Sequence, residues 1–330
     1  MQRSRFLVTA VTAILAAFAL VQTTIAQTRD ATSTTATRLI TLGTASGPIP
    51  RPHRAQSSNV LTVRGVHYVV DAGDGVARRL VKAGIDIRNI DTIFITHHHD
   101  DHTAGLGTLM SAAWDQNRTK PIHVYGPAGT EALVKAAVQY FNVSAQIRIA
   151  DGGVSVPLEQ VFIGHDVGTG LIYQDANIKL RAVENSHFTF HSGADAGRHK
   201  SYSFRVETPD RVVVFMGDSG PSAALTELAT DADLLVTQAS SFQDRMQAMI
   251  RNGRWQSMTP AEQARITQQA TRNITLEDIG RMAARARVKA VVLSHLSARA
   301  DGSDDYTPWA DEVRKYFAGP VHVANDLSEF

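Results

Sequence analysis

The chain has 330 residues, and its 43% hydrophobic and 20% charged content is that of an ordinary soluble globule. Lysine and arginine number 33 against 32 acidic residues, which falls short of the basic excess that a broad nucleic-acid-binding surface needs, so no nucleic acid partner is expected. Cysteine is absent, which excludes disulfides and thiolate ligands, and any metal must be held by carboxylates and the 13 histidines.

The beginning of the chain has the layout of a secretory signal peptide over residues 1–26. Arg3 and Arg5 give a basic start, residues 6–21 carry no charge, and small residues before the end of this stretch suit a cleavage site near Ala26. The apolar run is shorter than the ~20 residues that span a bilayer, so a permanent anchor is the weaker alternative. We expect a periplasmic or secreted protein that has no membrane contact after cleavage.

A polar, threonine-rich stretch at 27–37 predicts a disordered leader in front of one domain at 38–330. In that domain, β-branched runs predict strands at 39–44, 60–64, 67–71, 92–96, 122–125, 178–183, 202–206, 212–216, 234–237, 290–294 and 321–323. Apolar residues spaced at i, i+3 and i+4 predict helices at 75–83, 128–141, 276–286 and 309–317. This order favours an α/β fold in which two mixed β-sheets pack face to face with helices on the outer faces, an αβ/βα four-layer sandwich.

Residues 241–274 depart from this alternation and are expected to form a helical insertion. Apolar residues between 242 and 250 have helical spacing, and Thr259-Pro260 begins a second helix with proline in its first turn. The sequence leaves three roles open for this insertion: a surface helical pair packed on the core, a lid beside the site, or a contact in a homo-oligomer.

The chemistry is concentrated where a buried-looking strand runs into a cluster of histidines and aspartates. The cluster contains His97, His99, Asp101 and His102, and residues that leave the end of a strand together can converge on one point. Zn²⁺ and similar divalent ions accept this mixture of imidazole nitrogen and carboxylate oxygen. The two adjacent pairs predict two ions. A surface run of histidines is the alternative, but the preceding strand and the H-x-H-x-D-H spacing argue against it.

These residues belong to a set of motifs that resembles the metallo-β-lactamase superfamily, and within it the branch that includes ribonuclease Z and arylsulfatase-like enzymes. The resemblance runs from about residue 38 to residue 324 and includes the stretches 42–44, 56–58, 69–75 and 96–102. In the branch's first motif an aspartate supports the metal ligands from behind, which assigns that role to Asp71.

Three later motifs imply one further ligand each: His187 in E-N-S-H, Asp218 in F-M-G-D-S, and His295 in V-L-S-H-L. The resemblance implies that Asp218 bridges both ions. It assigns one ion to His97, His99, His187 and Asp218, and the other ion to Asp101, His102, Asp218 and His295. His191, four residues after His187, is the alternative ligand in its motif.

The function that the resemblance implies is metal-dependent hydrolysis with two divalent ions, for which zinc is favoured. Two such ions share a hydroxide, and Asp101 is the catalytic residue that orients or deprotonates it. Arg51, His53 and Arg54 are expected to add positive charge beside the site, which favours a small anionic ester as substrate, either a phosphodiester or a sulfate ester. Exposed solubilising arginines are the alternative explanation of this trio.

Other activities on the same site are lactone or β-lactam hydrolysis, although Asp218 stands where typical β-lactamases have Cys or Ser. A ribonuclease Z-type endonuclease is less favoured because Asn273 occupies the place of that family's His-x-Thr histidine. The 31 positions from His187 to Asp218 are also too few for the family's long RNA-gripping arm, and an exported protein does not meet precursor tRNA. A non-hydrolytic metal-binding or redox protein is the remaining alternative, against which the complete H-x-H-x-D-H set argues.

Overall fold

The computed structural model describes residues 36–153, 156–270, 273–299 and 302–330. The expected signal peptide and residues 27–35 of the expected leader lie outside these residues. Thr37, at the end of that leader, is buried, and its backbone N–H donates to Asp210 Oδ2 at 2.9 Å, so it belongs to the folded unit Thr37–Phe330. In the described part of the chain, no helix has both the length and the apolar character needed to cross a bilayer.

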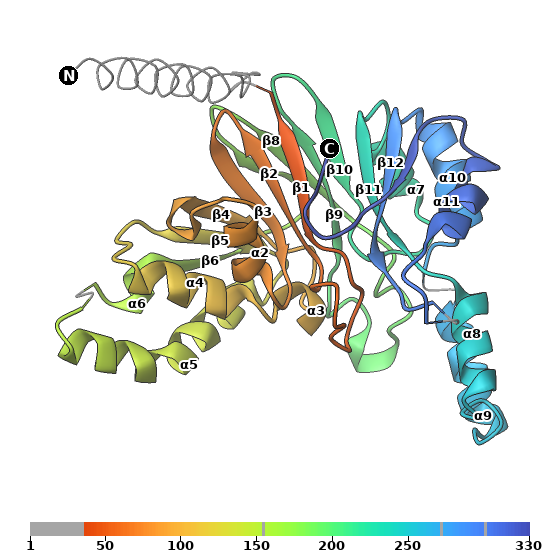
Figure 1. Cartoon of the computed structure of the whole chain (residues 1–330), viewed down its shortest axis with the longest axis horizontal. Helices are drawn as coiled ribbons and strands as arrows, with labels where there is room; N and C mark the ends of the chain where they lie inside the picture. Colours follow the sequence, from red (N-terminus) through yellow and green to blue (C-terminus); the bar gives the residue numbers. More distant parts are fainter. Residues whose placement is uncertain (1–35, 154–155, 271–272, 300–301) are drawn as a thin grey trace, which may run out of the picture. The chain divides into compact units, whose positions relative to one another are not determined.

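Two seven-stranded sheets make up this unit, and each is half parallel and half antiparallel (Figure 1). The first has the order β14-β1-β2-β3-β4-β5-β6, parallel from β3 to β6, and its strands are β1 Arg38–Gly43, β2 Ser58–Val63, β3 Val66–Ala72, β4 Ile90–Phe94, β5 Ile122–Gly126, β6 Phe162–Asp166 and β14 Ser328–Glu329. The second has the order β13-β12-β11-β10-β9-β8-β7, parallel from β10 to β13, and its strands are β7 Gly170–Gln174, β8 Lys179–Glu184, β9 Tyr202–Glu207, β10 Val212–Phe215, β11 Leu234–Ala239, β12 Ala290–Leu296 and β13 Val321–Val323.

Helices cover the outer face of each sheet, and a third apolar layer lies between the sheets. Residues such as Leu61, Phe94 and Phe204 from both sheets form this inner layer. The first outer layer contains α2 Val76–Lys82, α4 Leu106–Asp115, α5 Thr130–Ala150 and α6 Leu158–Val161, and the second contains α7 Ala223–Leu228, α10 Leu276–Ala286 and α11 Thr307–Arg314. The expected αβ/βα sandwich is confirmed. The remaining short helices are η1 Ile87–Asn89, α3 Asp100–Thr103 and η2 Gly193–Asp195.

The expected insertion contains two helices, α8 Phe242–Arg251 and α9 Pro260–Ala270, which project from the second half of the unit (Figure 1). Ser241 caps α8 by accepting a hydrogen bond from the Asp244 backbone N–H. Met249 and Ile266 are buried, whereas Ile250 is 45% exposed, so the apolar face of this pair is only partly covered.

Several elements differ from the sequence expectation. The strands β6, β7 and β14 and the helices α4, α6 and α7 were not expected. The strands were missed because β6 and β7 carry glycine and polar residues and β14 has only two residues. Helix α5 continues to Ala150, past the expected end at residue 141, because no glycine or proline interrupts the chain before Gly152, which has a φ of 79°. Helix α10 has its expected bounds, and Thr275 and Asp278 form a complete capping box at its start.

The packing of α10 against α11 gives a stability prediction. A Cβ atom on Gly280 would overlap the Val313 carbonyl oxygen and the Tyr316 side chain. Alanine favours a helix interior by about 1 kcal/mol over glycine. We nevertheless expect Gly280→Ala to lower the free energy of unfolding by about 1–3 kcal/mol, since overpacking outweighs propensity.

Chemical denaturation of both proteins measures this change. Ala284→Gly is the matched control on the exposed face of the same helix, and it should cost about 1 kcal/mol through propensity alone. A more stable Gly280→Ala protein would show that the two helices are not in close contact at this point.

Candidate metal centre

The candidate centre lies where the parallel strands of both sheets end. Asp71 is near the end of β3, and β4 runs into the loop that carries His97. In the second sheet, Asp218 follows β10, and His295 is near the end of β12. Ligand sites form at the carboxyl ends of such strands because several loops of the chain leave the sheet there side by side.

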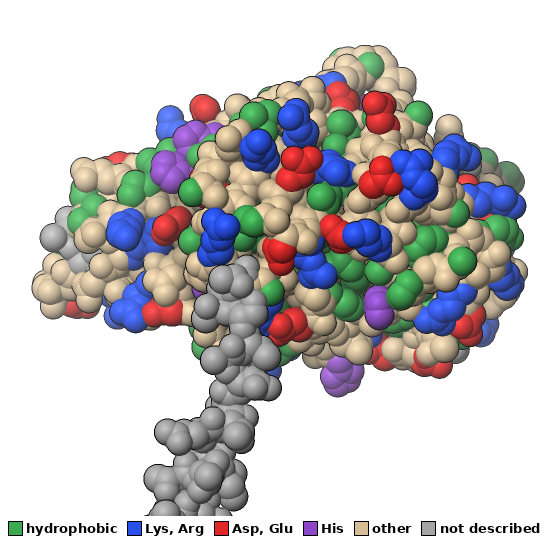
Figure 2. Space-filling view, turned by 90° about the horizontal axis from the view of Figure 1, so that it is seen from above, with side chains coloured by type: hydrophobic (Ala, Val, Ile, Leu, Met, Phe, Trp, Pro, Cys, Tyr) green, Lys and Arg blue, Asp and Glu red, His purple; other side chains and the backbone are tan. Residues whose placement is uncertain are grey.

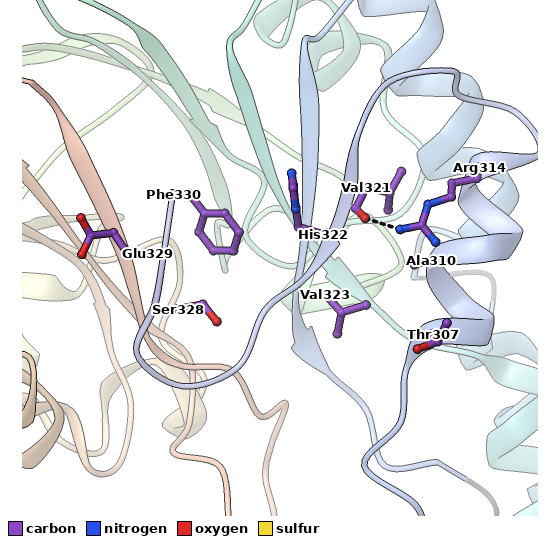
Figure 3. A pocket seen from close by; sticks show the side chains of 9 residues that line it. All are labelled: Thr307, Ala310, Arg314, Val321, His322, Val323, Ser328, Glu329 and Phe330. Atoms are coloured by element: carbon purple, nitrogen blue, oxygen red, sulfur yellow. Dashed lines mark hydrogen bonds between the residues drawn. The ribbon is translucent and has the colours of Figure 1, made fainter.

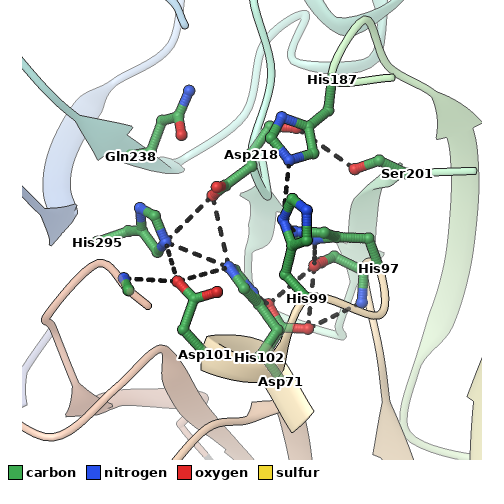
Figure 4. Close-up of polar contacts among 12 residues, drawn as sticks. Asp71, His97, His99, Asp101, His102, His187, Ser201, Asp218, Gln238 and His295 are labelled. Carbon is green, nitrogen blue, oxygen red and sulfur yellow. Dashed lines mark hydrogen bonds and ion pairs between the residues drawn. The ribbon is translucent and has the colours of Figure 1, made fainter. Parts of the chain in front are cut away.

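The first group of side chains contains His97, His99 and His187 (Figure 4). His97 Nε2 lies 3.0 Å from His99 Nδ1, and His187 Nε2 lies 3.2 Å from the same His99 nitrogen. Burial lowers the pKa of all three imidazoles, for His187 to about 4. At neutral pH three uncharged rings therefore direct nitrogens at one point, which is the form that binds metals.

The second group contains Asp101, His102 and His295. His295 Nε2 lies 3.1 Å from Asp101 Oδ2 and 3.2 Å from His102 Nε2. Burial opposes protonation of His102, but the carboxylates of Asp71, Asp218 and Asp101 outweigh it and raise the His102 pKa to about 10. This part of the centre is therefore negative enough to hold a positive charge.

Asp218 lies between the two groups. Its Oδ1 atom is 3.6 Å from His102 Nε2 and 3.4 Å from His295 Nε2, and the same carboxylate clusters with His97 of the first group. Asp218 Oδ1 is also buried without a hydrogen-bond partner. A buried, unpaired carboxylate oxygen is costly. A cation bound between these nitrogens and oxygens would remove that cost, so the donor set fits divalent ions.

Asp71 supports both groups from behind. Its Oδ2 atom lies 2.8 Å from His102 Nδ1, and its Oδ1 atom accepts hydrogen bonds from the Thr96 backbone N–H at 2.8 Å and from the Thr96 hydroxyl at 3.0 Å. The Thr96 hydroxyl in turn lies 3.1 Å from His97 Nδ1. Asp71 and His295 both have positive φ, 61° and 43°, an uncommon backbone conformation for these residue types that functional sites often contain. Asp71 thus has the supporting position that the sequence assigned to it.

Two residues contact the centre that the sequence did not single out. The Gly47 backbone N–H donates to Asp101 Oδ2 at 2.6 Å, and a Cβ atom at Gly47 would overlap the Asp101 carboxylate. No sequence signal marks this contact. Phe188 packs on the first group. In the sequence, only its position directly after His187 indicated that it could contact the centre. Most of the centre is buried, but His99 is exposed, so solvent reaches the first group past that side chain.

The expectation that Arg51 and Arg54 supply charge to the substrate is wrong for Arg54. Its guanidinium is buried and bonds to Asp304, Thr44 and the Ala324 carbonyl, which anchors the loop that carries Gly47. Arg51 donates to the Leu296 carbonyl and pairs with Asp304, and its side chain is 20% exposed. Both arginines therefore hold the loop in place, and His53 is the exposed member of the trio.

The other histidines lie outside the two groups, as expected. His98 is turned toward the Thr130 hydroxyl, 2.9 Å away. His191 packs on Phe188 and is in neither group. The remaining ones are His53, His67, His123, His165, His199 and His322.

A larger hollow of about 450 Å³ lies elsewhere, between α11, β13 and β14 (Figure 3). It contains none of the candidate ligands, and Arg314 within it donates to the Val321 carbonyl. A small cavity of about 20 Å³ lies directly behind the metal centre, beside Asp218 and Gln238. On the face in Figure 2, basic and acidic side chains are interspersed. The chemistry therefore belongs to the centre, and neither the larger hollow nor this face adds to it.

Comparison with known proteins agrees with this geometry. Residues 67–296 match the β-lactamase superfamily domain. The chain belongs to the metallo-β-lactamase superfamily. Ribonuclease Z of Mycobacterium marinum is 29% identical over 293 residues, which cover 87% of this chain and 95% of that protein. The family and this relative indicate a metal-dependent hydrolase.

Two solved structures share the fold of this member of the superfamily. The metallo-β-lactamase fold protein YhfI from Bacillus subtilis has a TM-score of 0.64 and 16% identity, over 89% of this chain and 98% of its own. The short form of human tRNase Z has a TM-score of 0.61 and 22% identity with the same coverage. These values support the fold. The structure brings the seven expected ligands together, and their role as metal ligands stays a prediction.

The shared position of Asp218 gives a prediction about metal content. Asp218→Ala should lower metal content from about two equivalents and reduce turnover by more than the 10–100-fold typical of losing a supporting residue. Asp71→Ala should behave as such a supporting loss, with weaker metal binding and partial activity.

Metal analysis after zinc reconstitution, together with turnover, measures these changes. His191→Ala is the control and should keep the wild-type metal content. Two retained metals in Asp218→Ala together with a lost metal in His191→Ala would mean that the ligand assignment in the second half is wrong.

Proposed function

We propose that this chain is a dinuclear, zinc-dependent phosphodiesterase. The observation that carries the proposal is the carboxylate of Asp218, which lies between the two groups and can serve ions in both. Two ions that share a ligand form a clamp for the attacking and leaving oxygens of a phosphoryl displacement. Imidazole and carboxylate donors without thiolates suit zinc.

Charge at the centre favours an anionic substrate. Two divalent ions would bring four positive charges, and the three carboxylates of Asp71, Asp101 and Asp218 bring three negative ones. Before a hydroxide adds its negative charge, the centre would carry one net positive charge, which favours an anionic substrate without help from Arg51 or Arg54. The ribonuclease Z relative cleaves the same kind of bond, which supports a phosphodiester over a sulfate ester.

When bound, the ions lower the pKa of water and polarise the phosphate. The protein's own contribution begins with Asp101. Burial raises the pKa of its carboxyl, but the hydrogen bond from His295 and the charge of His102 outweigh burial and hold the pKa well below its usual range. Of the two expected roles of Asp101, we favour orientation of the nucleophile. Gly47 fixes the carboxylate for that task through its backbone N–H.

A ribonuclease Z-type activity is the second candidate, favoured by the M. marinum relative. The similarity extends over 87% of this chain and 95% of that relative, so it includes most of both proteins. Asn273 still stands in place of the family's histidine, and its Oδ1 atom lies 3.5 Å from Gln238 Nε2, beside the centre. The proposed export would also separate the enzyme from precursor tRNA.

A panel of substrates distinguishes these activities. Zinc-loaded protein should hydrolyse bis(p-nitrophenyl) phosphate and lose this activity on chelation, with recovery on added zinc. Turnover of p-nitrophenyl sulfate, a lactone and a β-lactam should be lower by at least about tenfold, because those substrates are less well suited to a site in which two ions would hold the attacking and leaving oxygens of a phosphoryl group.

Asp101→Asn tests the role proposed for Asp101 and should lower turnover of the diester. Asp100→Asn, one position earlier and exposed, is its matched control and should keep the wild-type turnover. Efficient 3′ processing of a precursor tRNA with weak turnover of the small diester would favour the second candidate. Preferred turnover of the sulfate or β-lactam would contradict the phosphodiesterase proposal.

Export is a separate proposal that rests on residues 1–26 of the sequence. In a Gram-negative host the protein should collect in the periplasm with a new N-terminus near Gln27. Cell fractionation followed by N-terminal sequencing measures this. Intact Met1 on soluble protein in the cytoplasm would rule the proposal out.

A further inference from the structure

An aromatic layer extends outward from the first group of ligands along the loop 186–200. The Phe188 ring centroid lies 4.6 Å from that of His187, 5.3 Å from that of His99 and 5.7 Å from that of His97. Phe188 also stacks on His191, with centroids 5.2 Å apart and an interplanar angle of 17°. The layer therefore begins in contact with the candidate ligands.

The same layer continues to the surface. His191 meets Phe190 at 4.4 Å and His199 at 5.5 Å, both edge-on. Phe188, Phe190 and His191 are half-buried, and His199 is exposed. A ligand at the metal centre could therefore reach these rings from solvent.

Core packing does not account for these side chains. The three buried apolar clusters in the described part of the chain include neither Phe188 nor Phe190. His191 Nδ1 is buried and has no hydrogen-bond partner in the protein. An aromatic layer that is only half covered and contains an unpaired polar atom has the properties of a binding surface.

We propose that this aromatic layer is a subsite that stacks on a planar aromatic substituent of the scissile phosphate. The inference rests on the proposed function and identifies side chains of this chain that would select its substrate. A phosphate bound at the centre would have its substituent beside Phe188, because that ring packs on His97, His99 and His187. Aromatic side chains stack on any nucleobase, since every base has a π-face, and His191 Nδ1 adds one hydrogen-bonding atom.

Binding and turnover test the subsite separately. Calorimetry on zinc-loaded protein compares thymidine 5′-monophosphate with ethyl phosphate, which share the phosphate and differ in the aromatic base. Turnover compares the thymidine 5′-monophosphate p-nitrophenyl ester with ethyl p-nitrophenyl phosphate, which share the leaving group. We expect the nucleoside compound to be preferred by about tenfold or more in both measurements, as for one base–aromatic stack.

Three variants locate the preference. Phe188→Leu, His191→Leu and His199→Leu each remove a planar ring, and each should reduce the preference for the nucleoside compound toward one. Metal analysis of every variant identifies any loss that comes from altered ligands. Tyr140→Leu is the matched control, since Tyr140 is 77% exposed on α5 and is not part of the aromatic layer.

The outcomes are distinguishable. Equal binding of the two phosphates by the wild-type protein, or an unchanged preference in Phe188→Leu and His191→Leu, would overturn the subsite. A strong binding preference without hydrolysis of either ester would support the subsite and contradict the proposed hydrolysis. Turnover of both esters at equal rates, with equal binding, would support the hydrolysis and overturn the subsite.

Discussion

The centre depends on the hydrogen bonds that the buried carboxylate of Asp71 makes. This carboxylate accepts hydrogen bonds from the Thr96 backbone and hydroxyl and holds His102 Nδ1 at 2.8 Å, so one side chain joins β3, the loop after β4 and α3. A charge with 2% exposure is stable only when it is fully paired, and this set of bonds meets that condition. By occupying His102 Nδ1, Asp71 directs the other ring nitrogen toward the second group.

The second constraint is the packing of the two sheets. His97, His99, Asp101 and His102 come from the first sheet, whereas His187, Asp218 and His295 come from the second. Each group therefore contains at least one side chain from each of the two sheets. The apolar layer between the sheets, which includes Phe94 and Phe204, sets the distance between the halves. Ring nitrogens about 3 Å apart tolerate little change in that distance, which is why the layer matters to chemistry as well as stability.

Much of this could be predicted from the sequence, and the failures have physical reasons. Apolar runs at 93–95, 212–216 and 290–293 lie directly before the polar segments that contain His97, Asp218 and His295, so these strands and their polar ends were visible. The β6 and β7 strands were missed because pairing, not side-chain pattern, stabilises them. Arg54 was misjudged because its anchors, Asp304 and Ala324, are about 250 residues or more away along the chain. The Gly47 contact involves a backbone N–H, and the residue type does not indicate which backbone groups make such contacts.

The origin of the ligands in both sheets also bears on biosynthesis. A chain that has been translated only as far as β6 contains four of the seven candidate ligands, and the other three follow between residues 187 and 295. Neither group can then be complete, because each needs a side chain from the second sheet. With this ligand set, stable metal binding would follow the docking of the two sheets and would be a step of maturation and not of early folding.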